Sequence, residues 1–209
     1  MKNSRSTGLK KRVAREAALL LYTEQEKEYK QAKIKAAKTL GIRVLPSNLE
    51  VAAELDKIAE EQEGPIRQEM LLQKRKDALQ IMKTIRDFHP RLVGSVWRGT
   101  AHQNSDIDIT AFSANTDEVV NQLEKSGFRV ITAEWSSVTK RGQEESSFHV
   151  HFVLESGNEA EIVVRSSEKM GHPERCEIYG DTVKGLSLTQ LEKVLEENPF
   201  QKFLPKEMR

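Results

Sequence analysis

The sequence predicts an α+β fold in which a mixed sheet flanked by helices follows an N-terminal helical segment. Residues 10–40 contain no proline or glycine and repeat apolar side chains at helical spacing, which predicts one long helix ending at Gly41. Residues 106–109 alternate acidic and β-branched side chains, as a strand with one buried face does. Residues 148–154 and 160–164 flank a turn at 155–158 and predict a β-hairpin.

The remaining elements are predicted from residues that cap helices and from glycines and prolines that end them. Ser47 and Glu50 form a capping box that opens a second helix, which continues to Glu63 and is ended by Gly64 and Pro65. A third helix is expected over residues 66–88, then a short buried strand over 91–93. Further on we expect a helix over 116–125, strands over 128–135 and 176–179, and a final helix over 187–197.

Composition excludes several classes of protein. The 209 residues suggest one or two domains, and 33 basic against 32 acidic side chains give a net charge that points to no partner. The single cysteine, Cys176, excludes an intramolecular disulfide and fits a reducing compartment. The apolar stretch 17–22 is too short for a membrane span or a convincing signal peptide, so we expect a cytoplasmic protein with no membrane partner.

A glycine turn follows the strand expected at 91–93. Gly94 lacks a side chain, so a ligand can approach its backbone, and Ser95 begins a short helical turn. Such a turn presents unpaired N–H groups to an anion, and the Ser95 hydroxyl adds a donor for a phosphate oxygen. Arg98, one turn further, is expected to bind the same anion.

Two acids stand eleven and thirteen positions after Ser95. As a strand, residues 106–109 place Asp106 and Asp108 on one face and both isoleucines in the core. Mg²⁺ takes oxygen ligands and is often held by one or two carboxylates together with substrate phosphates. We therefore expect Asp106 and Asp108 to bind a pair of Mg²⁺ ions that act on a nucleoside triphosphate; the alternative is a solvated strand edge.

A third carboxylate is available on the hairpin. Glu161 lies on the expected strand 160–164 between Ala160 and Ile162, and we expect it to complete the metal site. Glu159 lies on the same face and is the alternative, although it is closer to the turn. An exposed hairpin position with no metal role is the other interpretation of Glu161.

These residues resemble the nucleotidyltransferase superfamily that shares the catalytic fold of DNA polymerase β. Its signature is a Gly-Ser turn, Asp-x-Asp on a strand and a third acid on a later strand. Residues 98–100 and 105–109 are similar to the archaeal CCA-adding enzymes and to small bacterial and archaeal nucleotidyltransferases. The resemblance implies that Asp106 and Asp108 bind both metals, that Glu161 holds the catalytic one, and that Gly94 and Ser95 bind the triphosphate.

In that fold the helix before the Gly-Ser strand is part of the catalytic unit. The resemblance therefore places a domain boundary at residue 65, with an N-terminal helical region over 1–65 and a nucleotidyltransferase catalytic domain over 66–209. It implies transfer of a nucleoside monophosphate to an acceptor hydroxyl with release of pyrophosphate. The alternative function is a catalytically silent nucleotide sensor or RNA-binding adaptor.

The N-terminal region is basic and then acidic. Residues 1–41 carry eleven Lys or Arg against four Glu, and such a cluster would bind RNA or tRNA phosphates without sequence preference. The helix from Ser47 is rich in acids and could instead pair with the basic one, within the fold or across a homodimer. A protein side chain or a small molecule remains open as the acceptor.

Other candidate groups have a structural interpretation. Trp97 could stack on a base, but we expect it to close the core behind the turn. His102, His149 and His151 have no Cys or His partner at a zinc-like spacing, so we expect His149 and His151 to lie on one strand face as surface or pocket-lining groups. Residues 136–147, with Lys140 and Arg141, are expected to form a hairpin loop or a mobile flap.

Overall fold

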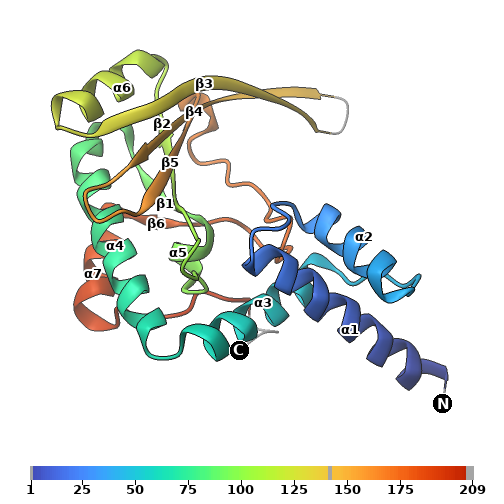
Figure 1. Cartoon of the computed structure of the whole chain (residues 1–209). Helices are drawn as coiled ribbons and strands as arrows, with labels where there is room; N and C mark the ends of the chain where they lie inside the picture. The colour runs from blue at the N-terminus through green and yellow to red at the C-terminus, as the bar shows by residue number, and fades with distance from the viewer. Residues whose placement is uncertain (1, 141–142, 206–209) are drawn as a thin grey trace.

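The computed structural model describes residues 2–140 and 143–205, which form a helical unit followed by a sheet covered by helices (Figure 1). The helical unit comprises α1 (Lys2–Tyr22), α2 (Tyr29–Leu40) and α3 (Asn48–Glu63). The other helices are α4 (Ile66–Thr84), α5 (Gly94–Arg98), α6 (Thr116–Lys125) and α7 (Leu188–Glu197), with 3₁₀ turns at Arg86–Phe88 and Ser167–Lys169. The strands are β1 (Arg91–Leu92), β2 (Ile107–Phe112), β3 (Arg129–Lys140), β4 (Gln143–Val153), β5 (Glu159–Arg165) and β6 (Leu186–Ser187).

The expected single helix over residues 10–40 is wrong, because the chain reverses between α1 and α2. Glu24 adopts a positive φ of 56°, which ends α1, and the Glu26 N–H donates to the Leu20 carbonyl at 3.2 Å across the turn. Buried alanines on both helices let the backbones approach closely, and together with α3 they enclose a hydrophobic cluster. The end of α2 at Gly41 and the Ser47–Glu50 capping box at the start of α3 are confirmed.

Basic α1 and acidic α3 pair within the chain. Lys10 lies 2.8 Å from Glu50, and Arg15 lies 2.6 Å from Glu61. The acidic helix therefore neutralises part of the basic cluster inside the fold, whereas Lys11 and Arg12 remain exposed.

The sheet is mixed, with strand order β3-β4-β5-β2-β1-β6. Strands β2 and β5 run parallel, and the other neighbours are antiparallel. Helices α4, α6 and α7 lie along one side of the sheet, and α1 to α3 stand on the other side (Figure 1). The expected α+β architecture is confirmed.

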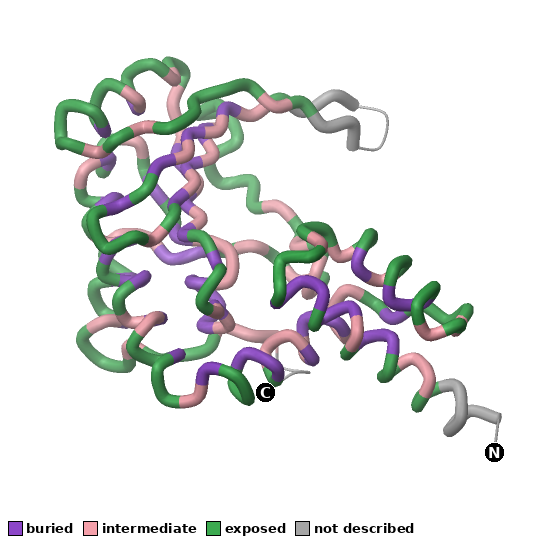
Figure 2. The backbone as a smooth tube through the Cα atoms, viewed as in Figure 1, coloured by how far each residue is buried: buried purple, intermediate pink, exposed green. Residues whose placement is uncertain are grey.

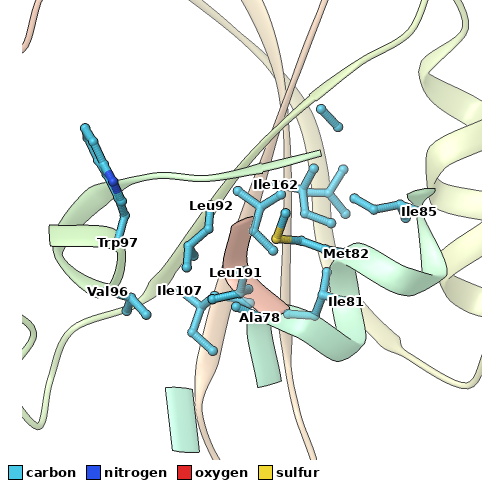
Figure 3. Packing of buried hydrophobic residues seen from close by; sticks show 14 of the residues in the cluster. Ala78, Ile81, Met82, Ile85, Leu92, Val96, Trp97, Ile107, Ile162 and Leu191 are labelled. Carbon is cyan, nitrogen blue, oxygen red and sulfur yellow. The ribbon is translucent and has the colours of Figure 1, made fainter. Parts of the chain in front are cut away.

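One hydrophobic core lies between the sheet and α4, α6 and α7. Ile107 and Ile109 of β2 are fully buried in it, as the alternation of residues 106–109 predicts. Figure 3 shows Ile81 and Met82 of α4 in the same cluster as Ile107 and as Ile162 of β5. Figure 2 shows a second set of buried stretches in α1 to α3, which form their own cluster.

Two expectations downstream need correction. Most of residues 136–147 extends β3 and β4 as paired strands, and Arg141 lies outside the described residues. The expected strand over 176–179 is wrong: Gly180 N–H donates to the Cys176 carbonyl at 2.8 Å to close a turn, and β6 forms later, against β1. No helix within residues 2–140 and 143–205 combines the length and apolar character needed to cross a membrane.

Candidate active site

The Gly94-Ser95 turn lies directly against the acid strand. Gly94 opens α5 with a φ of 66°, and a Cβ placed there would come within 1.9 Å of Oδ2 of Asp108. The backbone N–H of Val93 donates to the Asp108 carbonyl at 2.9 Å, which fixes the turn to β2. The glycine is therefore required for the close approach of the Asp108 carboxylate as well as for the backbone conformation.

Parallel pairing brings the acids of two strands to the same edge of the sheet. Asp108 is the second residue of β2 and lies opposite Glu161 of β5, and Asp106 immediately precedes β2. Because β2 and β5 run parallel, both begin at this edge, and the register places the directly opposite residues Asp108 and Glu161 on one face. The structure thus brings together Gly94, Asp106, Asp108 and Glu161 from three separate segments.

The grouped carboxylates disfavour each other's charge. Burial, together with the neighbouring Glu161 and Asp106 carboxylates, raises the pKa of Asp108 to about 7. Burial and Glu159 also raise the pKa of Asp106, against the opposing effect of Lys74. A divalent cation among these oxygen donors would offset this repulsion, so the donor set fits Mg²⁺.

The two candidate third acids differ in their surroundings. The Glu161 carboxylate lies 2.5 Å from Nδ1 of His149 and 3.5 Å from Nε2 of His151, both on β4. Glu159 instead lines the open cleft beside Asp106 and Asp108. Register thus favours Glu161 as the partner of Asp108, while Glu159 is more open to a ligand in the cleft.

Asp106, Asp108 and Glu159 open onto a large cleft of about 2000 Å³ between the two parts of the chain. Its walls include Tyr29 and Asn48 of the helical unit, Ser95 of α5 and Tyr179 of the segment before β6. Cations also line it: Lys27, Lys30, Arg91, Arg175 and Lys184. The cleft has room for a nucleoside triphosphate and part of a second substrate, since pockets for drug-sized ligands are typically about 300–1,000 Å³.

Arg98 lines the cleft, but its guanidinium is engaged by other groups of the fold. Its side chain is 3% exposed, and its guanidinium forms bonds of 2.6 and 3.0 Å with the Asp181 carboxylate and one of 3.0 Å with the Phe203 carbonyl. The same group lies 4.3 Å from the ring centroids of both Trp97 and Tyr179. These contacts tie α5 to the C-terminal segment, so this placement does not favour the expected contact with the triphosphate.

Sequence reasoning missed the cations of α4 that hold the loop between α5 and β2. Arg67 donates to the carbonyls of Thr100 and Ala101, each at 3.0 Å, and Lys74 donates to that of Ser105 at 2.7 Å. Both side chains are buried on the face of α4 that also carries Leu71. Charged residues seven positions apart on an apolar helix face are a signal that could have found them.

The remaining candidates fall into two groups. Trp97 is 5% exposed and belongs to the core cluster, as expected. His149 and His151 share one face of β4 as expected, and the structure adds a carboxylate partner from β5.

The family of this chain follows from one comparison with known proteins. The model of the nucleotidyltransferase domain family matches residues 73–178, about half of the chain, including Gly94, Asp106, Asp108 and Glu161. This chain belongs to the nucleotidyltransferase domain family. No curated protein matches it.

Solved structures resemble the nucleotidyltransferase domain only distantly. A cytoplasmic RNA terminal U-transferase is 16% identical with a TM-score of 0.34, covering 54% of this chain and 35% of its own. The Cid1 poly(U) polymerase bound to MgATP is 15% identical with a TM-score of 0.34, covering 54% and 38%. A GLD-2/RNP-8 complex is 13% identical with a TM-score of 0.32, covering 56% and 40%. This chain thus spans well under half the length of these proteins.

Proposed function

We propose that this nucleotidyltransferase transfers a nucleoside monophosphate from a nucleoside triphosphate to an acceptor hydroxyl, releasing pyrophosphate. The observation that carries the proposal is the contact of Asp108 with the Gly94 turn at the edge of a large cleft. Phosphoryl transfer needs positioning and charge neutralisation rather than a protein nucleophile. Carboxylates beside a turn with free N–H groups supply both.

Each residue has a defined part in this proposal. Ser95 and the backbone N–H groups that follow Gly94 would bind the β and γ phosphates, and Asp106 and Asp108 would hold two Mg²⁺ ions. Bound Mg²⁺ neutralises phosphate charge and makes the attacking hydroxyl more acidic. Glu161, opposite Asp108, would complete the metal site and accept the acceptor's proton, with Glu159 as the alternative.

We propose RNA, including a tRNA end, as the acceptor. The support is the set of cations along the cleft, with Lys27 and Lys30 on the helical unit and Arg91 and Lys184 beside the sheet. Phosphate contacts of this kind do not depend on sequence and weaken as salt rises. Lys11 and Arg12, exposed on α1, would extend the basic surface beyond the cleft.

We also propose the domain boundary at residue 65. The helices before it and the elements after it enclose separate hydrophobic clusters. Arg67, just beyond the boundary, joins the two parts through Asp56 at 2.6 Å and Glu60 at 3.0 Å. The helical region would thus act as the opposite wall of the cleft over the catalytic domain.

Labelled triphosphates tested one at a time with Mg²⁺ and total RNA provide the test. We expect label in RNA with the wild-type protein and a loss of at least about 100-fold with Asp108→Asn, because removing a group that stabilises transition-state charge has an effect of about this size. Asp117→Asn, on α6, is the matched control and should transfer normally. Equal transfer by the wild type and Asp108→Asn would refute the proposal, and triphosphate binding without transfer to any acceptor would favour the silent sensor.

A further inference from the structure

Three metal-ligating side chains meet on the sheet face beside Asp108. His149 and His151 alternate along β4 and so share one face, and Glu161 lies opposite His151 on β5. Oε1 of Glu161 is 2.5 Å from Nδ1 of His149 and 3.5 Å from Nε2 of His151. Two imidazoles therefore approach the same oxygen of Glu161.

The spacing of these atoms fits one metal ion. One ligand atom from each of the three residues lies within 4.8 Å of the other two. Tetrahedral zinc with bonds of 2.0–2.1 Å to nitrogen places its ligand atoms about 3.4 Å apart. The side chains of His149, His151 and Glu161 are 24%, 43% and 23% exposed, so small rotations reach this spacing and solvent can fill the open position.

The arrangement also holds one imidazole by its second nitrogen. Nε2 of His149 lies 2.7 Å from the Ser147 hydroxyl, two residues earlier on the same strand. Histidine ligands in metal sites usually donate their other N–H to such an oxygen, which sets the tautomer and the ring orientation. When Nε2–H is donated to Ser147, Nδ1 presents its lone pair toward Glu161 and can bind a metal ion once the 2.5 Å contact between Nδ1 and Oε1 opens to metal-ligand spacing.

We propose that His149, His151 and Glu161 form a binding site for a divalent metal ion of the zinc, cobalt and nickel class. Imidazole suits these ions, whereas Mg²⁺ prefers oxygen ligands throughout, so the two histidines distinguish this site from the acid pair. The proposal of metal binding depends only on the three side chains and not on the proposed function. Only the sharing of Glu161 with phosphoryl transfer rests on the proposed function.

Titration of the metal-stripped full-length protein with Co²⁺, followed by visible absorption without nucleotide, tests the site. We expect one equivalent to bind with the absorption of a nitrogen-ligated ion and to resist displacement by excess Mg²⁺. His149→Gln, His151→Gln and Glu161→Gln should each weaken binding at least about tenfold. Ser147→Ala should weaken it roughly tenfold, the lower end of what loss of such an outer contact causes.

Two variants serve as controls, with circular dichroism to verify folding of every protein. His172→Gln removes an exposed histidine away from β4 and should bind Co²⁺ as the wild type does. Asp108→Asn should keep Co²⁺ affinity close to wild type while losing nucleotide transfer. Undiminished binding by both histidine variants, or binding lost only in Asp108→Asn, overturns the site. Transfer retained by Asp108→Asn refutes the proposed function and leaves the Co²⁺ result standing.

Discussion

At the scale of single residues, Gly94 shows how close packing dictates residue type. The sequence suggests that its missing side chain admits a ligand, and the structure adds that the carboxylate of Asp108 fills the space where a Cβ would stand. The positive φ adds a second cost for any other residue. The site therefore depends on a glycine that contributes no chemical group of its own.

We expect Gly94→Ala to abolish most transfer because the new methyl group displaces Asp108. Strain from the positive φ and the clash should lower the free energy of unfolding by about 1–3 kcal/mol. Single-turnover transfer and urea unfolding measure both effects. Gly127→Ala is the matched control: its φ is 87°, and nothing lies within 4 Å of the added Cβ, so it should carry the backbone cost and keep activity. Similar activity in the two variants would contradict this account.

His102 is the second residue with a testable consequence. Burial, with Arg67 and Lys74 nearby, lowers the pKa of His102 from about 6.5 to about 4. Its Nδ1 accepts from the Asn104 backbone N–H at 3.3 Å, which requires the neutral ring. The unfolded chain therefore binds a proton between these pH values that the folded chain does not.

Stability linked to His102 should be present above pH 6.5 and should fall as the pH drops toward about 4. The pKa difference corresponds to a loss of at most about 3 kcal/mol, less than the full value because the ring is partly exposed. Urea unfolding of wild type and His102→Gln at a series of pH values measures it. The variant should show a flatter profile over this window, and parallel profiles would exclude His102 as the source.

At the scale of elements, α4 is the support on which the site is built. Its buried face carries charged side chains that bond to loops and to the neighbouring helices α3 and α5. Asp77 accepts from the Ser156 hydroxyl and the Asn158 amide, both at 2.6 Å, and so fixes the β4–β5 turn. Lys74 joins the same turn to the loop before β2, through Asn158 at 3.0 Å and Ser105 at 2.7 Å. One helix thus positions both acid strands.

Asp77→Ala should destabilise the fold by about 1–3 kcal/mol, because two part-buried hydrogen bonds to a charged acceptor are lost. It should also reduce transfer, since the turn before Glu159 and Glu161 loses its anchor. Thermal unfolding and transfer rates measure these effects. Asp87→Ala, at a side chain that is 84% exposed, is the matched control and should change neither by much. If Asp77→Ala is as stable as the control, the β4–β5 turn does not depend on Asp77.

At the scale of the whole molecule, two separately packed units enclose one cleft. The small residues of α1 and α2 determine how closely the helices of the first unit approach, whereas its surface ion pairs, such as Arg15 with Glu61, contribute little. Arg67 and Tyr22 connect this unit to the loop before β2: Asn104 Nδ2 donates to the Tyr22 carbonyl at 3.3 Å. A movement of the helical unit would therefore shift the loop before β2 and, with it, the strand that carries Asp108.

A larger side chain in the core of the helical unit should make this unit unfold before the sheet. Ala36 is fully buried between helices, so Ala36→Leu should cost about 1–3 kcal/mol and lower the unfolding midpoint of the helical unit ahead of the sheet. Calorimetry would show this as an earlier transition. Thr39→Leu adds the same side chain on the exposed side of α2 and should leave the melting profile near wild type. A single shifted transition would indicate one cooperative unit.

The sequence by itself determined the fold class, the capped ends of α2 and α3, the burial of Ile107 and Ile109 and the placement of Asp106 and Asp108 on one strand face. Each follows from spacing over a few residues, which local physics controls. Only the tertiary structure decided the break after Tyr22, the withdrawal of Arg98 to Asp181 and the meeting of His149 and His151 with Glu161. These depend on partners far along the chain, and no local pattern encodes a contact between strands or between a turn and the C-terminal segment.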